Sequence, residues 1–238
     1  MCTLSFVFSN GKAIITHNRD EKTARLPAIA PRKYTVNNTT VFFPKDQEAG
    51  GTWFAVAENG TVAVLLNGAD EKHIQKPNYR KSRGNIVLDI ISSNSPIDFW
   101  TIINLENIEP FTLIVFQNNK LYQLRWNEVE KSTINLDVNL KYIWSSSTLY
   151  PKEIQEKRAQ WFDDFVTNKG IITATDLYNF HQNTEIDNTE NGLVINRNDK
   201  LKTLSITQVV IEKNEVSMFY FDLIEDKKDV TNFQIQVN

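Results

Sequence analysis

Two Asn-Gly pairs, Asn10-Gly11 and Asn59-Gly60, each lie between two short runs rich in β-branched and aromatic residues. An Asn-Gly pair in this position is a strong signal for a β-hairpin, because both residues readily adopt the positive φ angles of a type I′ turn. The pairs predict hairpins built from residues 2–9 with 12–18 and from residues 52–58 with 61–67. Further strands are expected at 111–117 and 120–126, joined by Asn118-Asn119, and at 141–146, 203–211 and 215–223. The chain is therefore expected to be built around antiparallel sheets.

Helices are expected in two segments between these strands. One starts near Ser82, and Ser95-Pro96, a capping residue followed by proline, opens another. Residues 151–168 place their apolar side chains on one helical stripe, and residues 175–182 form a shorter helix. With the segments 82–104 and 151–182 covering the outer faces of two stacked sheets, a single α+β domain over residues 1–238 is the economical interpretation.

Composition narrows the classes of partner. The net charge is −3 and the pI is about 5.7, so there is no basic footprint for nucleic acid, and a small-molecule substrate or ligand is the expected partner. The apolar start is too short for a secretory signal, and no run reaches the roughly 18 apolar residues of a membrane span. One cysteine allows no internal disulfide, which fits a cytoplasmic location. The three histidines, His17, His73 and His181, lack ligand spacing, so neither a metal nor a cofactor is expected.

The first hairpin places the only cysteine beside an arginine. Counting outward from a two-residue Asn10-Gly11 turn pairs Cys2 with Arg19, and cross-strand neighbours lie about 4.5–5.5 Å apart at Cβ. Cys2 then ends a row that faces the core, and His17 shares its face. Asp20 pairs near Met1 and is expected to reach the N-terminus that removal of Met1 would create.

The second hairpin suggests an oxyanion site. Counting from Asn59-Gly60 pairs Trp53 with Leu66 and Thr52 with Asn67. Asn67 would therefore end a strand beside Gly50-Gly51, where missing side chains allow a backbone or ligand to approach closely. A carboxamide held there is a candidate oxyanion donor.

Removal of Met1 would give Cys2 both a base and a nucleophile. The exposed α-amine has an ordinary pKa of about 7.7–8.0 and the thiol one of about 8.5. The amine can activate the thiol of the same residue, while Arg19 favours the thiolate. The expected reaction is transfer of an acyl group from an amide or thioester to Cys2, and then to water or another acceptor.

Five short motifs occur in an order that resembles the NRDE family, also described as transport and Golgi organisation protein 2-like. They are Met1-Cys2-Thr3, Asn18-Arg19-Asp20-Glu21, Gly50-Gly51-Thr52-Trp53, Leu65-Leu66-Asn67 and Ser82-Arg83-Gly84. The resemblance implies a four-layer αββα sandwich of the N-terminal-nucleophile hydrolase type, related to choloylglycine hydrolases. It also implies that Cys2 is the nucleophile, Arg19 and Asp20 are its neighbours, and Asn67 donates to the oxyanion. His17, Asn18, Thr52 and Ser146 are the residues expected to contact the substrate.

The second half of the chain departs from the choloylglycine hydrolase pattern. Residues 144–147 and 203–207 carry serines and threonines where that pattern has an asparagine and an arginine. Three classes of function therefore stay open. The first is an amidohydrolase, acting on carbon–nitrogen bonds other than peptide bonds, or an acyltransferase. The second is a non-catalytic carrier of a lipid-, acyl- or haem-like ligand, and the third is a purely structural interaction protein.

Overall fold

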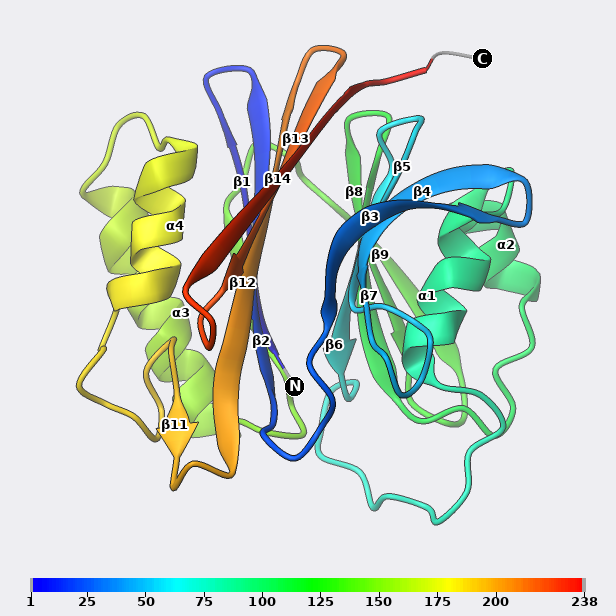
Figure 1. Ribbon diagram of the computed structural model, residues 1–238, viewed down its shortest axis with the longest axis horizontal. Helices are drawn as coiled ribbons and strands as arrows, with labels where there is room; N and C mark the ends of the chain where they lie inside the picture. The colour runs from blue at the N-terminus through cyan, green and yellow to red at the C-terminus, as the bar shows by residue number, and fades with distance from the viewer. Residues whose placement is uncertain (1, 237–238) are drawn as a thin grey trace. The chain divides into compact units, whose positions relative to one another are not determined.

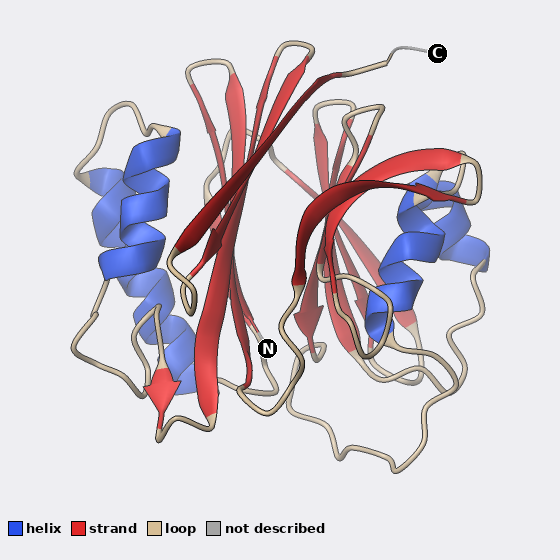
Figure 2. Cartoon of the chain, in the orientation of Figure 1, coloured by secondary structure: helices blue, strands red, loops and turns tan. Residues whose placement is uncertain are grey.

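The computed structural model describes residues 2–236, which form two compact units. One unit contains the N-terminal segment through Arg25 and Val138–Phe233, and the other contains Leu26–Asp137 and the C-terminal segment from Gln234. Within the described residues, each unit holds one seven-stranded sheet and two helices (Figures 1 and 2). Every strand pair with a described register is antiparallel. The predicted α+β class with antiparallel sheets is confirmed.

The sheet of the first unit has the strand order β10-β1-β2-β12-β13-β14, and β11 pairs with β12 beside this path. Both helices of this unit pack against one face of the sheet (Figure 1), which we call the helix face. We call the opposite face, which carries Cys2, the Cys2 face. The elements are β1 (Cys2–Ser9), β2 (Lys12–Lys22), β10 (Tyr142–Ser145), α3 (Lys152–Thr167), α4 (Ala174–Asn183), β11 (Asn196–Arg197), β12 (Leu201–Glu212), β13 (Glu215–Asp222) and β14 (Lys227–Gln234).

The first and third hairpins have the predicted registers. Asn10 and Gly11 have φ angles of 49° and 73°, and Cys2 pairs with Arg19 across the strands they connect. Asn118 and Asn119 also have positive φ angles, with Gln117 opposite Lys120. Positive φ at both central residues is the geometry of a type I′ turn, whose twist matches that of the flanking strands.

An apolar cluster joins the helix face of the sheet to the two helices that cover it. Val7 and Ile14 of the sheet pack with Phe162 of α3 and with Leu177 and Phe180 of α4. The helix α4 begins with a reciprocal capping box between Thr173 and Asp176, which satisfies backbone N–H groups that the first turn leaves without partners. The amphipathic stripe expected over residues 151–168 is thus the contact between α3 and the sheet.

The sheet of the second unit has the order β3-β4-β5-β6-β7-β8-β9. Ser82 and Ser95 cap its two helices through their side chains, as the sequence predicts. No helix in the described part of the chain is both long enough and apolar enough to cross a membrane. The elements are β3 (Ile29–Val36), β4 (Thr39–Lys45), β5 (Phe54–Ala57), β6 (Val62–Asn67), α1 (Arg83–Ile91), α2 (Pro96–Ile102), β7 (Phe111–Gln117), β8 (Lys120–Trp126) and β9 (Lys131–Leu136).

The register predicted for the second hairpin is wrong by one residue. The Ala57 amide donates to the carbonyl oxygen of Thr61 at 2.8 Å, so the loop has three residues, with Gly60 at a φ of 81°. Val62 pairs with Val56, and the amide of Leu65 donates to Trp53 at 2.9 Å. A three-residue hairpin loop ends on a residue with a positive φ angle, and Gly60 fits that position as well as it would fit the second position of a two-residue turn. Trp53 therefore lies opposite Leu65 instead of Leu66.

Several strands were not predicted. The turn between β3 and β4 consists of Asn37 and Asn38, both with positive φ, which is the chemistry already recognised at Asn118-Asn119. Pro44 within β4 weakens the strand signal, since proline cannot donate to the ladder. Strands β9 and β14 are largely exposed and polar, so they lack the apolar alternation that identifies a half-buried strand.

Two of the glycine motifs meet through their backbones in the second unit. A Cβ atom added to Gly51 would lie 2.4 Å from the carbonyl carbon of Gly84, and one added to Gly84 would lie 2.9 Å from the amide nitrogen of Thr52. The Thr52 amide donates to the Gly84 carbonyl at 3.2 Å. Glycine is required at both positions because the start of α1 rests directly on the segment that precedes β5.

We expect Gly51→Ala to lower the free energy of unfolding by at least about 1–3 kcal/mol, because the new methyl group would overlap backbone atoms, which cannot move away as a flexible side chain can. Gly170→Ala is the matched control, since an added Cβ there meets nothing within 4 Å. Urea unfolding of both variants checks this prediction. Equal midpoints for the two variants would contradict it.

Candidate active site

Cys2 and Arg19 form the centre of the candidate site. They are direct cross-strand partners in β1 and β2, and their exposed fractions are 3% and 4%. The Arg19 guanidinium lies 3.9 Å from a carboxylate oxygen of Glu21. The predicted juxtaposition of a thiol and an arginine is therefore present within the first unit.

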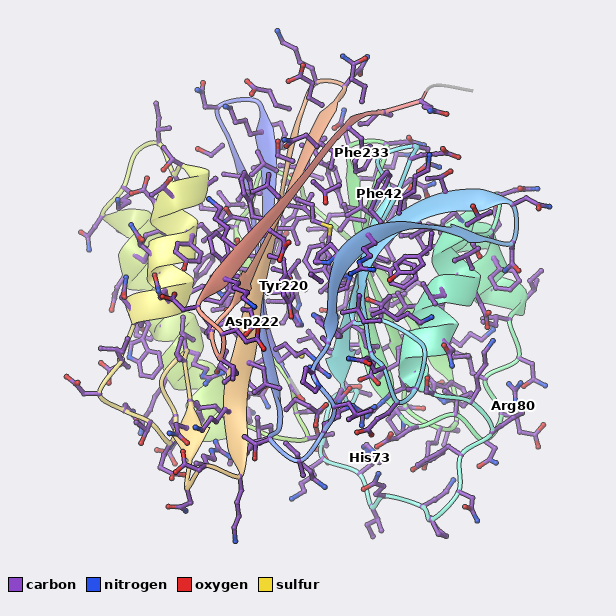
Figure 3. The ribbon with its side chains drawn as sticks, viewed as in Figure 1. Phe42, His73, Arg80, Tyr220, Asp222 and Phe233 are labelled. Atoms are coloured by element: carbon purple, nitrogen blue, oxygen red, sulfur yellow. The ribbon has the colours of Figure 1, made fainter. Side chains whose placement is uncertain are left out.

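The Cys2 face is polar at one end and apolar at the other. The registers of four adjacent strands place Cys2, Arg19, Ser205 and Asp222 in one row across the sheet. Asp222 lies on β13, and so does Tyr220, which belongs to the row beside it (Figure 3). The second row consists of Leu4, His17, Thr207 and Tyr220, and the next rows of Phe6, Ile15, Val209 and Met218, then Phe8, Ala13, Ile211 and Val216. His17 thus shares the face of Cys2, as predicted.

A β-bulge at Leu204 changes the faces to which the side chains on either side of it point. Thr203 pairs with Asp20, whereas Ser205 pairs with Arg19. Residues two apart in a regular strand point to the same face, but the extra residue sends these two side chains to opposite faces. Thr203 therefore lies on the helix face, and Ser205 lies beside Arg19.

Burial works against ionisation of the Cys2 thiol. Burial raises the pKa of the Cys2 thiol above its ordinary value, and the negative charge of Asp20 raises it further, while Arg19 lowers it. Arg19 therefore acts in the predicted direction, but burial outweighs it. Removal of Met1 lies outside the described residues, so the state of the thiol after processing stays a prediction.

Asp20 points to the helix face, away from the side chain of Cys2. Its two carboxylate oxygens accept hydrogen bonds from the hydroxyl groups of Tyr150 at 2.6 Å and Thr203 at 2.7 Å. Burial raises the pKa of Asp20, and Arg158, Tyr150 and Thr203 oppose that shift. Its predicted contact with the processed N-terminus stays a prediction, whereas its contacts with Tyr150 and Thr203 were not foreseen.

Arg158 of α3 is a fully buried cation within this network. Its guanidinium donates to Thr3 and to the carbonyl oxygens of Asn191 and Gly192, and it stacks 3.5 Å from the ring centroid of Tyr150. The arginine therefore joins β1, α3 and the segment that follows α4. Its charge also favours the ionised form of Asp20.

His181 of α4 forms a second buried group on the helix face. Asn18 donates from its amide nitrogen to the carbonyl oxygens of His181 and Leu193 at 3.0 and 2.7 Å, so its side-chain oxygen is left to accept from Nδ1 of His181 at 2.7 Å. Nε2 must then accept from the hydroxyl of Ser5, also at 2.7 Å. Burial and the charge of Arg158 lower the pKa of His181 to about 3. The Asn18 side chain is therefore held by α4 and the loop after it, and its expected contact with substrate stays a prediction.

The remaining predicted residues divide between the two units. The backbone amide of Ser146 donates to the Cys2 carbonyl at 2.9 Å, so Ser146 adjoins the site. Asn67 ends β6, opposite Phe111, and Thr52 donates to backbone carbonyls of Pro44 and Phe54. The Thr52 hydroxyl is therefore hydrogen-bonded within its own unit, and its expected role in binding stays a prediction. An approach of Asn67 to Cys2 stays a prediction.

Tyr150, Arg158 and His181 are the residues that sequence reasoning missed. Arg158 carried a signal, because it lies four residues after Ile154 and four before Phe162, on the apolar stripe of its helix. A charged residue on such a stripe is normally buried only with partners. In the described part of the chain, no group of three or more His, Cys, Asp or Glu side chains is placed to hold a metal ion.

Solved structures show the fold class to which this arrangement belongs. A cysteine-to-alanine mutant of conjugated bile acid hydrolase from Clostridium perfringens aligns with a TM-score of 0.53 and 11% identity, covering 100% of this chain and 99% of that chain. The Caenorhabditis elegans ortholog of N-acylethanolamine-hydrolyzing acid amidase aligns with a TM-score of 0.58 and 11% identity, covering 87% and 92%. The fold is that of the N-terminal-nucleophile hydrolases, as the resemblance implied.

The family is shown by the sequence itself. Residues 1–226 match the family described as Transport and Golgi organisation 2, and the chain belongs to that family. No curated protein matches the sequence.

Proposed function

We propose that this protein is an N-terminal-cysteine amidohydrolase or acyltransferase that acts on a small-molecule amide or thioester. The observation that carries the proposal is the pairing of Cys2 with Arg19 at the polar end of the Cys2 face. Two further findings support it, the family membership and the fold shared with a conjugated bile acid hydrolase and an N-acylethanolamine-hydrolyzing acid amidase. The single cysteine is consistent with a cytoplasmic location.

The proposed reaction uses groups that Cys2 would carry after loss of Met1. The α-amine of Cys2 takes the thiol proton, and the thiolate forms a bond to the carbonyl carbon of the substrate. The resulting oxyanion is stabilised by donors, for which Asn67 is our candidate. Collapse expels the amine or thiol, which receives the proton, and water or another acceptor then releases the acyl group.

One observation favours a second candidate function. Residues 144–147 and 203–207 carry serines and threonines where the choloylglycine hydrolase pattern has an asparagine and an arginine, and this favours ligand binding without turnover. A carrier of a lipid-, acyl- or haem-like ligand would keep Cys2 and Arg19 as binding groups. This alternative predicts that a ligand is bound without being cleaved.

We expect the protein that has lost Met1 to gain one acyl group at Cys2 when it is incubated with a simple acyl thioester. The reason is that processing adds the α-amine next to the only thiol. Intact-mass and peptide mass spectrometry would establish the N-terminus and locate the adduct. Cys2→Ala and a preparation that retains Met1 are the controls, and both should stay unmodified.

The same measurement separates the two candidates. An adduct that disappears with time and releases free acid supports hydrolysis, and one that passes to an added amine supports acyl transfer. Mature protein that binds the thioester but forms no adduct would contradict the enzyme proposal and favour the carrier.

A further inference from the structure

The first residue of β1 is held on both sides. Cys2 pairs with Arg19 of β2, and its carbonyl oxygen accepts from the backbone amide of Ser146 at 2.9 Å. The first residues of a chain are poorly ordered unless contacts of this kind tie them down. A nucleophile that becomes the end of the chain therefore depends on such contacts more than a nucleophile in the middle of a chain does.

The side chain of the next residue adds a third contact, on the helix face. The Thr3 hydroxyl accepts a hydrogen bond from Nη1 of Arg158, and both side chains are fully buried. Nε and Nη2 of the same guanidinium donate to the carbonyl oxygens of Asn191 and Gly192. The start of β1 is thus joined through one arginine to α3 and to the segment that follows α4.

The chemistry of these two side chains makes the contact rigid. The Arg158 guanidinium is planar and its donors are fixed in direction, and its stacking 3.5 Å from the ring centroid of Tyr150 fixes its plane. Threonine is β-branched, so Thr3 has few accessible χ1 angles. Holding its hydroxyl therefore also holds the backbone from which Cys2 projects to the opposite face.

We propose that Thr3 and Arg158 are positioning residues, which keep the start of β1 in place and so orient the α-amine and the thiol of mature Cys2 toward the substrate. This inference rests on the proposed function, because the orientation of these two groups matters when they react. A misplacement of about 1 Å can slow a reaction by about a hundredfold. The proposal gives two residues on the helix face a part in chemistry that takes place on the Cys2 face.

The first test is the rate at which the mature protein forms its adduct with a simple acyl thioester. Thr3→Val replaces the hydroxyl by a methyl group, while Arg158 keeps its two carbonyl partners. We expect acylation at saturating thioester to be about tenfold to a hundredfold slower, with little change in the half-saturating concentration. Thr3→Ser retains the hydroxyl and should restore most of the wild-type rate, which a role in packing alone would not predict.

Thr16→Val is the matched control for the loss of a buried hydrogen bond in the same sheet. The Thr16 side chain is fully buried on the helix face, and its hydroxyl accepts from Gln208 at 2.8 Å. This variant should unfold at a lower urea concentration than the wild type and still be acylated at the wild-type rate. The comparison separates the orientation of Cys2 from overall stability.

Hydrogen exchange tests the contact without acyl transfer. We expect faster exchange in the peptide that covers β1 of Thr3→Val than in the same peptide of the wild type, because the start of the strand opens more often once the contact is lost. The measurement applies even if the wild type forms no adduct. That result would contradict the proposed function and leave the exchange rates to decide whether the contact holds the start of β1.

Three results would overturn the inference. The first is acylation of Thr3→Val at the wild-type rate, the second is a Thr3→Ser variant as slow as Thr3→Val, and the third is unchanged exchange of β1 in Thr3→Val. If Thr3→Val does not fold, Arg158→Lys keeps the charge and loses the planar fork, so it should show the same slow acylation. A wild-type rate in that variant would equally overturn the inference.

Discussion

Replacing Arg158 by methionine is expected to lower the free energy of unfolding by about 3–5 kcal/mol, the range for removing one partner from a buried charged pair. The substitution leaves Asp20 in the interior without a buried cation that favours its ionised form. It also removes the donors to the carbonyl oxygens of Asn191 and Gly192, and buried acceptors without partners are costly. Urea denaturation followed by circular dichroism measures the effect.

The neighbouring residue on the same helix provides the control. Lys157 is exposed and pairs with Glu153 at 2.7 Å with i, i+4 spacing, and exposed pairs of this kind contribute little to stability. Lys157→Met should therefore leave the free energy of unfolding almost unchanged. An Arg158→Met variant as stable as Lys157→Met would show that the buried network does not depend on the arginine.

Acid is expected to destabilise the protein through His181. Its pKa is about 3 in the folded state and about 6.5 in an unfolded chain, so the unfolded state binds one more proton between these values. The contribution of this group is fully present above pH 6.5 and is lost, at about 1.4 kcal/mol per pH unit, as the pH falls toward 3. Asp20 acts in the opposite sense, because its pKa is raised in the folded state.

Comparison of variants isolates the histidine from Asp20. The difference in unfolding free energy between the wild type and His181→Gln should shrink as the pH is lowered from 7 to 4, since only the wild type loses the contribution of a neutral imidazole. Curves for His181→Gln and the wild type that run parallel would contradict the assignment of a neutral, buried His181.

The predictable parts of the site were those set by local chemistry. The pairing of Cys2 with Arg19 follows from one turn and the period-two rule, because Asn10-Gly11 fixes the register of its own hairpin. The same rule failed at Asn59-Gly60, since that pair also fits a three-residue loop, and the difference of one residue displaces every cross-strand pair.

The position of Asp20 shows what a local reading overlooks. Alternation places it on the face opposite Arg19, and its partners Tyr150 and Thr203 lie 130 and 183 residues further along the chain. No pattern within one strand identifies such partners. Arg158 was the one accessible sign, since a cation on an apolar stripe indicates a buried anion or carbonyl group elsewhere in the fold.

The bulge at Leu204 separates two roles of β12. Because Thr203 donates to Asp20 while Ser205 lies in the row of Cys2, a substitution at position 203 changes the support of a buried carboxylate, and a substitution at position 205 changes the Cys2 face. If Leu204 were instead a regular member of the strand, Thr203 and Ser205 would lie two residues apart and point to a common face. Relatives could therefore vary the side chain at position 205 without disturbing the buried scaffold, provided that the bulge is kept.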